Sequence, residues 1–319
     1  MIDTLKRTIL LAAALLLVTG CKKHNYSDIP AYLHLDKMDV VDKSGSGAPA
    51  GFFTSEIDAV QLIAYWDGDE AETILGTFQL PCTIPVMRNE TITRLDVVPV
   101  IKQNGIAATR IEYPYFKYVN LTDVPLAADS TTNLGTQDST GIWVLSTEYK
   151  PWRQWSASNT GSSDTLITVM AEEYFEKIQY SILFTSPMDR IVDNADVRTG
   201  TGSGMVHVTR DKDAIDFEID KTIEVNDPTK NLYLEMDYRT DVKLSVGMRS
   251  SYRAGGTEDT QSAITLYETN GKWRKIYINL GRLWSQFNYN STFHVVFSAL
   301  NSDGVDGYVY LDNVKLLTI

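Results

Sequence analysis

The sequence predicts an all-β protein that folds as two β-sandwich modules, a small immunoglobulin-like one followed by a larger one. Short runs of alternating apolar and polar residues follow one another along the chain, and none keeps the 3.6-residue period of a long helix. The 319 residues are also many for one hydrophobic core, because single cores usually stop growing at about 250–300 residues. The 41 acidic and 29 basic residues give a net charge of −12, which argues against binding to nucleic acid.

The start of the chain has the pattern of a bacterial secretion signal. Lys6 and Arg7 precede an apolar run at residues 9–18. This run is too short for a membrane-spanning helix, which needs about 20 apolar residues, but it suits the apolar region of a signal peptide. We therefore predict that residues 1–20 are a signal peptide.

The five residues 17–21 (LVTGC) resemble the lipobox of bacterial lipoproteins. In that motif a small residue, here Gly20, precedes the cleavage point. The resemblance implies that Cys21 becomes the first residue of the mature chain and carries acyl groups, palmitate among them, which anchor the protein in the outer membrane. Surface-exported lipoproteins often carry acidic residues after the cysteine, whereas Lys22 and Lys23 stand here. The side of the membrane therefore stays open.

Residues 21–28 are polar and lack an apolar period, so we expect a short tether between the lipid and the first module. Cys82 is the one other cysteine. If Cys21 is acylated, Cys82 has no partner within the chain for a disulfide. Because no charged His or Lys stands beside it, Cys82 is expected to be a small buried residue and not a reactive thiol.

The first module is predicted to be a small sandwich at residues 29–119. A turn cluster at residues 67–70 separates a strand that ends at Trp66 from one that begins at Thr73, which is the pattern of a hairpin. The Asn-Gly pair at residues 104–105 favours the positive backbone angles of a tight turn and predicts a second hairpin.

A polar stretch follows, and we place the boundary between the modules there. Residues 120–141 are rich in Asp, Ser, Thr and Gly, which is typical of a linker. Ser130 and Ser139 in this stretch, and Thr165 beyond it, follow an aspartate in tripeptides that resemble O-glycosylation acceptors of Bacteroidota. The resemblance implies that these three hydroxyls carry sugars.

The second module is predicted to be a jelly-roll sandwich at residues 142–319. Residues 232–238 illustrate its pattern, because their apolar side chains alternate with Glu235 and Asp237. Alternation of this kind predicts a half-buried strand with the two carboxylates on the other face. Many such strands at short spacing indicate a sandwich.

The end of the chain carries a resemblance to a known domain type. Residues 271–280 and 310–316 look like the last strands of galactose-binding-type, carbohydrate-binding-like jelly rolls. Together with the lipobox and the acidic charge, this makes the chain similar to outer-membrane lipoproteins of Bacteroidota. Such jelly rolls often hold a structural calcium ion, and Asp312 matches an acidic position of the closing strand. Calcium needs about six to eight oxygen ligands, which one aspartate does not supply. We expect no other cofactor.

Two tryptophans, Trp152 and Trp155, flank Arg153 close to loop-like sequence. Exposed aromatic planes beside polar side chains are what sugar rings stack on, so these three residues are the candidate glycan-binding site. The other interpretation is that the tryptophans cover the core or join the two modules, and the sequence leaves both interpretations open.

No coherent catalytic set is present, so we expect a protein that binds and is not an enzyme. The four histidines are scattered, and none forms a metal-binding pair. The first hypothesis is a lipid-anchored, non-enzymatic subunit of an outer-membrane complex for transport, secretion or assembly. The alternative is a glycan-binding lipoprotein that captures polysaccharides. The partners expected are the membrane, outer-membrane proteins or a glycan, and not nucleic acid.

Overall fold

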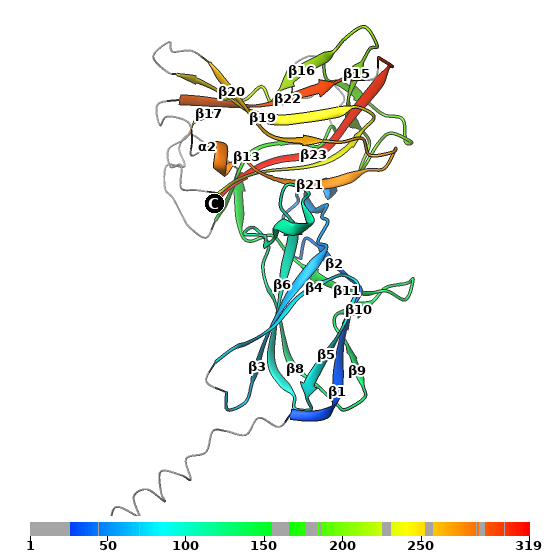
Figure 1. Cartoon of the computed structure of the whole chain (residues 1–319), viewed down its shortest axis with the longest axis vertical. Coiled ribbons are helices and arrows are strands. Elements are labelled where there is room, and N and C mark those ends of the chain that lie inside the picture. Colours follow the sequence, from blue (N-terminus) through cyan, green and yellow to red (C-terminus); the bar gives the residue numbers. More distant parts are fainter. Residues whose placement is uncertain are drawn as a thin grey trace, which may run out of the picture.

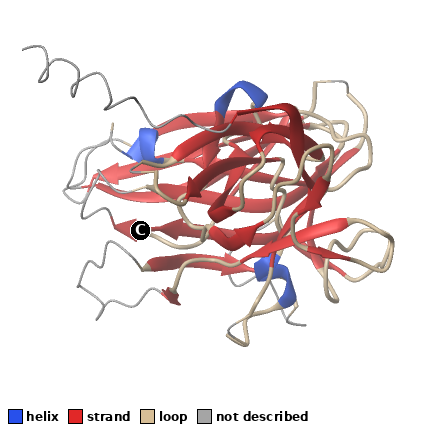
Figure 2. Cartoon of the chain, turned by 90° about the horizontal axis from the view of Figure 1, so that it is seen from below, coloured by secondary structure: helices blue, strands red, loops and turns tan. Residues whose placement is uncertain are grey.

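The fold is all-β, as the sequence predicts, and strands dominate both modules (Figure 2). The computed structural model describes residues 26–43, 45–69, 71–154, 166–176, 184, 187–224, 231–252, 258–284, 286, 291–302 and 304–319. No helix in these ranges is long and apolar enough to cross a membrane. In Figure 1 the first module lies below and the second module above.

The first module comprises eleven strands and two short 3-10 turns. They are β1 (Tyr26–Leu35), β2 (Lys37–Val40), η1 (Ala50–Phe53), β3 (Ala59–Trp66), β4 (Thr73–Gln79), β5 (Cys82–Arg88), β6 (Ile92–Lys102), η2 (Ala107–Thr109), β7 (Arg110–Glu112), β8 (Val119–Val124), β9 (Thr131–Asn133), β10 (Thr136–Gln137) and β11 (Trp143–Thr147). Three sheets, ordered β5-β1-β9, β10-β11-β2 and β4-β3-β6-β7 with β8 beside β6, enclose its core.

Both predicted hairpins of this module are confirmed. β3, which ends at Trp66, pairs antiparallel with β4, which begins at Thr73. β6 pairs with β7, and between them Asn104 and Gly105 take φ angles of 56° and 68°. The Asn-Gly pair therefore supplies the left-handed backbone that the turn requires.

The structure differs from the predicted linker at residues 120–141. That stretch contains most of β8 and all of β9 and β10, and β9 pairs in parallel with β1. β11, which we placed in the second module, pairs in parallel with β2 of the first. The composition of this stretch is polar because these short strands bury few side chains, Val124 and Leu145 among them, and expose their polar ones. The first module thus extends to about residue 150.

The second module comprises twelve strands and one helical turn. They are β12 (Trp152–Gln154), β13 (Ile167–Glu173), β14 (Asp189–Ile191), β15 (Ser203–Val208), β16 (Ala214–Glu218), β17 (Ile223–Glu224), β18 (Leu232–Thr240), β19 (Lys243–Tyr252), β20 (Asp259–Leu266), β21 (Arg274–Asn279), α2 (Gly281–Trp284), β22 (Ser291–Leu300) and β23 (Gly307–Thr318).

Two sheets form the sandwich of the second module. The larger sheet contains β12, β13, β14, β15, β18, β21 and β23, and the smaller sheet contains β16, β17, β19, β20 and β22. Apolar side chains of both sheets form one core between them. Phe217 and Phe297 of the smaller sheet stack within it, with ring centroids 5.0 Å apart. These residues hold β16 against β22, which positions the outer face of the smaller sheet.

The outer faces of the two sheets have different surroundings. The outer face of the larger sheet packs against the first module, whereas the smaller sheet lies at the far end of the molecule (Figure 1). Glu235 and Asp237, which the sequence predicted on the half of a strand that faces away from the core, are therefore completely buried at the junction. Both faces of β18 are therefore covered.

Candidate functional site

Four charged side chains of the larger sheet are buried where the modules meet. We call them the junction cluster: Glu235, Asp237, Lys275 and Lys315. The hydroxyls of Tyr113 and Tyr149, from the first module, each donate a hydrogen bond of 2.7 Å to the carboxylate of Glu235. Lys315 Nζ lies 2.8 Å from Glu235 Oε2 and donates to the carbonyl oxygen of Phe52 at 2.6 Å. Charges of one module are thus satisfied by groups of the other.

Asp237 and Lys275 of the junction cluster are likewise hydrogen-bonded to a residue of the first module. Thr54 Oγ1 donates to Asp237 Oδ2 at 2.7 Å, and Lys275 Nζ donates to Thr54 Oγ1 at 3.0 Å. Lys275 Nζ also lies 3.6 Å from Asp237 Oδ2. Buried charges require this degree of pairing, because an unpaired charge in a protein interior is strongly destabilising.

Burial and pairing act against each other on the pKa values of the junction cluster. Burial alone would raise the pKa of Glu235, but the ammonium groups of Lys315 and Lys275 and the hydrogen bonds hold that pKa below its usual value. Burial lowers the pKa of Lys315 to about 8, although Glu235 opposes the change. Since these side chains are closed to solvent, we assign the cluster to holding the modules together and not to ligand binding.

Asp312, the predicted calcium ligand, lies beside the junction cluster and is fully buried. Its Oδ2 accepts hydrogen bonds from Ser203 Oγ at 3.0 Å and Thr199 N at 3.1 Å, and its Oδ1 accepts one from Asn313 N at 2.7 Å. No group of three or more His, Cys, Asp or Glu side chains in the described ranges could hold a metal ion. Because donors surround the carboxylate, the residues present do not fit a calcium site.

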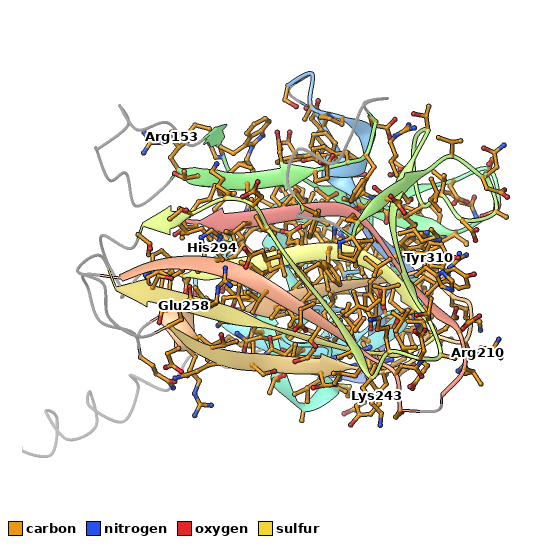
Figure 3. All side chains as sticks on the ribbon, turned by 90° about the horizontal axis from the view of Figure 1, so that it is seen from above. Arg153, Arg210, Lys243, Glu258, His294 and Tyr310 are labelled. Carbon is orange, nitrogen blue, oxygen red and sulfur yellow. The ribbon has the colours of Figure 1, made fainter. Side chains whose placement is uncertain are left out.

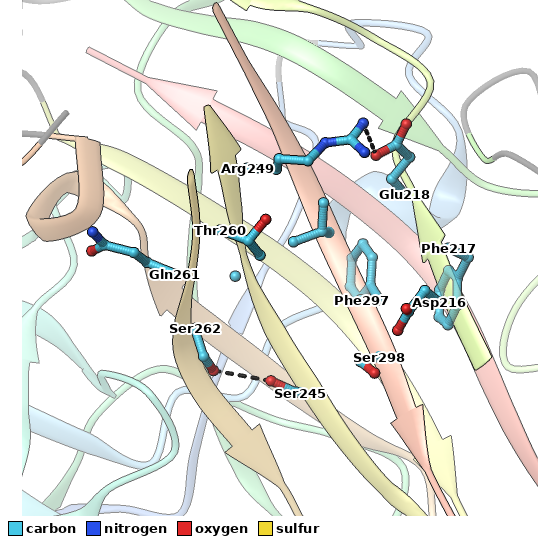
Figure 4. Close-up of a pocket in the computed structure, with 12 residues that line it drawn as sticks. Asp216, Phe217, Glu218, Ser245, Arg249, Thr260, Gln261, Ser262, Phe297 and Ser298 are labelled. Atoms are coloured by element: carbon cyan, nitrogen blue, oxygen red, sulfur yellow. Dashed lines mark hydrogen bonds and ion pairs between the residues drawn. The ribbon is translucent and has the colours of Figure 1, made fainter. Parts of the chain in front are cut away.

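A groove of about 470 Å³ lies on the outer face of the smaller sheet (Figure 4). Strands β16, β19, β20 and β22 contribute its lining. The lining residues are Asp216, Phe217, Glu218, Ser245, Gly247, Arg249, Thr260, Gln261, Ser262, Val296, Phe297 and Ser298. This is the site that the sequence did not reveal, and it is the candidate functional site of the chain.

The floor of the groove carries no charge and lies below the polar side chains around it. Val296 of β22 lies directly across from Gly247 of β19 in the strand register. A Cβ on Gly247 would lie 2.2 Å from the carbonyl oxygen of Gln261, so only glycine fits where β20 approaches β19. The missing side chain leaves the hollow between the taller polar side chains around it.

Polar side chains surround this floor. Ser298 stands between Asp216 and Ser245 in the register of the three neighbouring strands. The hydroxyls of Ser245 and Ser262 are hydrogen-bonded to each other at 2.9 Å. Within the described part of the chain, three polar side chains of the lining have no hydrogen-bond or ion-pair partner: Asp216, Thr260 and Ser298. Their oxygens are therefore available to a ligand.

Arg249 and Glu218 form the charged end of the groove. Arg249 Nη2 lies 2.5 Å from Glu218 Oε2, and Nη1 lies 3.9 Å from Glu258 Oε2 at the rim. Figure 4 shows the guanidinium of Arg249 turned toward Glu218. Its Nε is buried and has no hydrogen-bond partner within the described ranges. The ion pair fixes both side chains at one wall of the groove.

Two of the three predicted glycan-binding residues, Trp152 and Arg153, are described by the structure. Trp152 is half-buried and stacks on Phe52, with ring centroids 4.7 Å apart. Arg153 is the next residue of β12, so its side chain leaves the strand on the opposite face, and its Nε lies 3.5 Å from Thr168 Oγ1. Figure 3 labels Arg153 at one edge of the molecule. The stacking favours the interpretation that Trp152 joins the modules, and its contact with sugar stays a prediction.

Some predicted site residues lie outside the described ranges. They are Cys21, the lipidation site, Trp155 and Thr165. Ser130 and Ser139 are described, and both are exposed, as acceptors of O-glycosylation must be. Their modification stays a prediction.

The comparisons with known proteins concern architecture. No protein-family model and no curated protein matches the chain. The chain is similar to a solved carbohydrate-binding module of the β-sandwich superfamily, with 10% identity over 91% of this chain and 98% of that chain and a TM-score of 0.34. A family 11 module of a Clostridium thermocellum cellulosomal cellulase has 14% identity over 46% of this chain and 94% of that chain, with a TM-score of 0.31. A family 61 module solved with β-1,4-galactotriose has 12% identity over 42% of this chain and 85% of that chain, with a TM-score of 0.28. At these values a ligand has to be argued from the chain's own residues.

Proposed function

We propose that the chain is a glycan-binding protein and that its ligand lies in the groove of the smaller sheet. The observation that carries the proposal is the ring of polar side chains, three of them without partners, around the uncharged floor of Val296 and Gly247. Sugars offer the matching chemistry, since they combine apolar C–H faces with many hydroxyls. A mostly apolar floor with a few placed polar groups is also the general form of a small-ligand site.

The groove supports binding and not hydrolysis. A glycoside hydrolase needs two carboxyl groups that face each other across the scissile bond. Asp216 and Glu218 stand two residues apart on one edge of the groove, on the same strand, and Glu218 is paired with Arg249. The first hypothesis, a subunit of an outer-membrane complex, receives no comparable support from the described residues. We therefore favour the alternative hypothesis, glycan capture.

Replacing Asp216 with alanine should weaken glycan binding about tenfold, because a hydrogen bond to a charged group contributes about 1.5–3 kcal/mol. Asp216 is exposed and lies within the groove without a partner in the described part of the chain, so the fold should be unaffected. Titration calorimetry against the tightest-binding member of a neutral oligosaccharide panel measures the change.

Arg210→Ala is the matched control, since Arg210 is an exposed residue paired with Asp306 and lies at the opposite side of the second module from Glu258 in Figure 3. Equal affinities of the Asp216→Ala variant, the control and the unchanged protein would place the ligand elsewhere.

The lipid anchor belongs to the same proposal. It is supported by the basic start, the short apolar run and the LVTGC motif that ends at Cys21. We expect the native chain to incorporate a clickable palmitate analogue in bacterial culture and to sediment with membranes, and we expect Cys21→Ser to abolish both. A Cys21→Ser variant that is still labelled would refute acylation at this residue, and Cys82→Ser serves as the control.

A further inference from the structure

The groove carries an excess of negative charge. Asp216 and Glu218 are acidic, and Glu258 stands at the rim beside Arg249. Among the described residues that line the groove, Arg249 is the one cation. Lys243 lies on β19 two positions before Ser245 and is outside the lining, and counting it together with Glu258 still leaves more negative than positive charges.

The one cation of the lining is already neutralised. The guanidinium of Arg249 has Glu218 at 2.5 Å and Glu258 at 3.9 Å. A carboxylate or sulfate on a ligand would have to displace one of these partners to reach it. It would also approach Asp216, which forms no ion pair in the described part of the chain. Both effects disfavour an anionic ligand.

Resting on the proposed function, we infer that the groove selects glycan chains without negative charge and rejects chains that carry uronate or sulfate groups. Unpaired Asp216 accepts hydrogen bonds from two neighbouring hydroxyls of a neutral sugar, whereas like charges in the same position repel. The pairing of Glu218 with Arg249 is therefore a specificity device, because it removes the group that would attract acidic sugars.

The test uses the intact protein and two sets of defined probes of equal length: neutral oligosaccharides (xylo-, manno-, gluco- and galacto-oligosaccharides) and oligogalacturonides. At low ionic strength the best neutral probe should bind at least about tenfold more tightly than any oligogalacturonide, a difference of about 1.4 kcal/mol. Half-molar salt should narrow the gap, because the charges at the rim are exposed and screened.

Glu218→Gln provides the sharper measurement, since it keeps the shape of the side chain and releases Arg249 from its nearer partner. This variant should gain oligogalacturonide affinity by about tenfold, while its affinity for the neutral probe changes less. The double variant Glu218→Gln/Arg249→Gln should lose that gain, which ties it to the guanidinium. Circular dichroism of each variant checks that the fold is retained.

The outcomes separate the two proposals. If neutral and acidic probes bind the unchanged protein equally well, glycan binding stands and the selectivity is overturned. If Glu218→Gln gains nothing for oligogalacturonides, the role of the Arg249–Glu218 pair is overturned. If no probe of either set binds, the proposed function itself fails, and the selectivity fails with it.

Discussion

Replacing Lys315 with methionine will lower the free energy of unfolding by about 3–5 kcal/mol, the usual effect of removing one partner of a buried ion pair. Lys315 is completely buried. Its ammonium group forms an ion pair with Glu235 and donates hydrogen bonds to the hydroxyl of Tyr149 and the carbonyl oxygen of Phe52. Methionine fills similar space but leaves Glu235 with a weaker set of partners. Equilibrium unfolding in urea, followed by tryptophan fluorescence, measures the loss.

Two further variants show that the loss comes from the broken pair. Lys315→Met combined with Glu235→Gln should recover at least half of the lost stability, because the second change removes the charge that the first left unpaired. Lys243→Met is the matched control, since Lys243 forms no ion pair within the described ranges, and it should change stability by no more than about 0.5 kcal/mol. A Lys315→Met variant as stable as the control would mean that the junction cluster does not hold the modules together.

Asp312→Asn will change how stability depends on pH. Burial raises the pKa of Asp312 to about 7, although hydrogen bonds from Ser203, Thr199 and Asn313 oppose the rise. In the unfolded chain an aspartate titrates near 3.9. Between these values the folded protein therefore binds one more proton than the unfolded chain, so the contribution of Asp312 is fully present below about pH 4 and is lost as pH rises through 7.

The asparagine variant lacks this titration. From pH 5 to pH 8 the stability of the unchanged protein should fall, relative to that of Asp312→Asn, by about 3 kcal/mol, which is about two units of pKa difference. Asp306→Asn is the control, because hydrogen bonds from Arg210 lower the pKa of exposed Asp306 and it stays ionised throughout this range. Parallel pH curves for the unchanged protein and Asp312→Asn would show that Asp312 titrates normally.

Local sequence patterns predict where the strands are, but not what packs against each face of a strand. The alternation at residues 232–238 correctly predicts the strand β18 and its apolar face. It places Glu235 and Asp237 on the other face, and that face is covered by the first module. Alternation records which side chains share a face, but it contains no information on whether water or a second module lies against that face.

The boundary and the groove were missed for related reasons. Residues 120–141 are polar because β8, β9 and β10 expose most of their side chains, and polar composition alone does not separate such strands from a linker. The groove joins residues of β16, β19, β20 and β22, whose order in the sheet differs from their order in the chain. No local pattern brings Asp216 beside Ser298, which follows it by 82 positions along the chain.

The junction cluster also has a mechanical consequence. β1, where the described chain begins, and the smaller sheet lie at opposite ends of the molecule (Figure 1). A force applied between these two ends would act on the junction through the covalent chain between β11 and β12 and, in parallel with it, through contacts such as those between Glu235 and the hydroxyls of Tyr113 and Tyr149. These buried contacts would then resist bending and separation of the two modules under load, which the covalent connection alone does not.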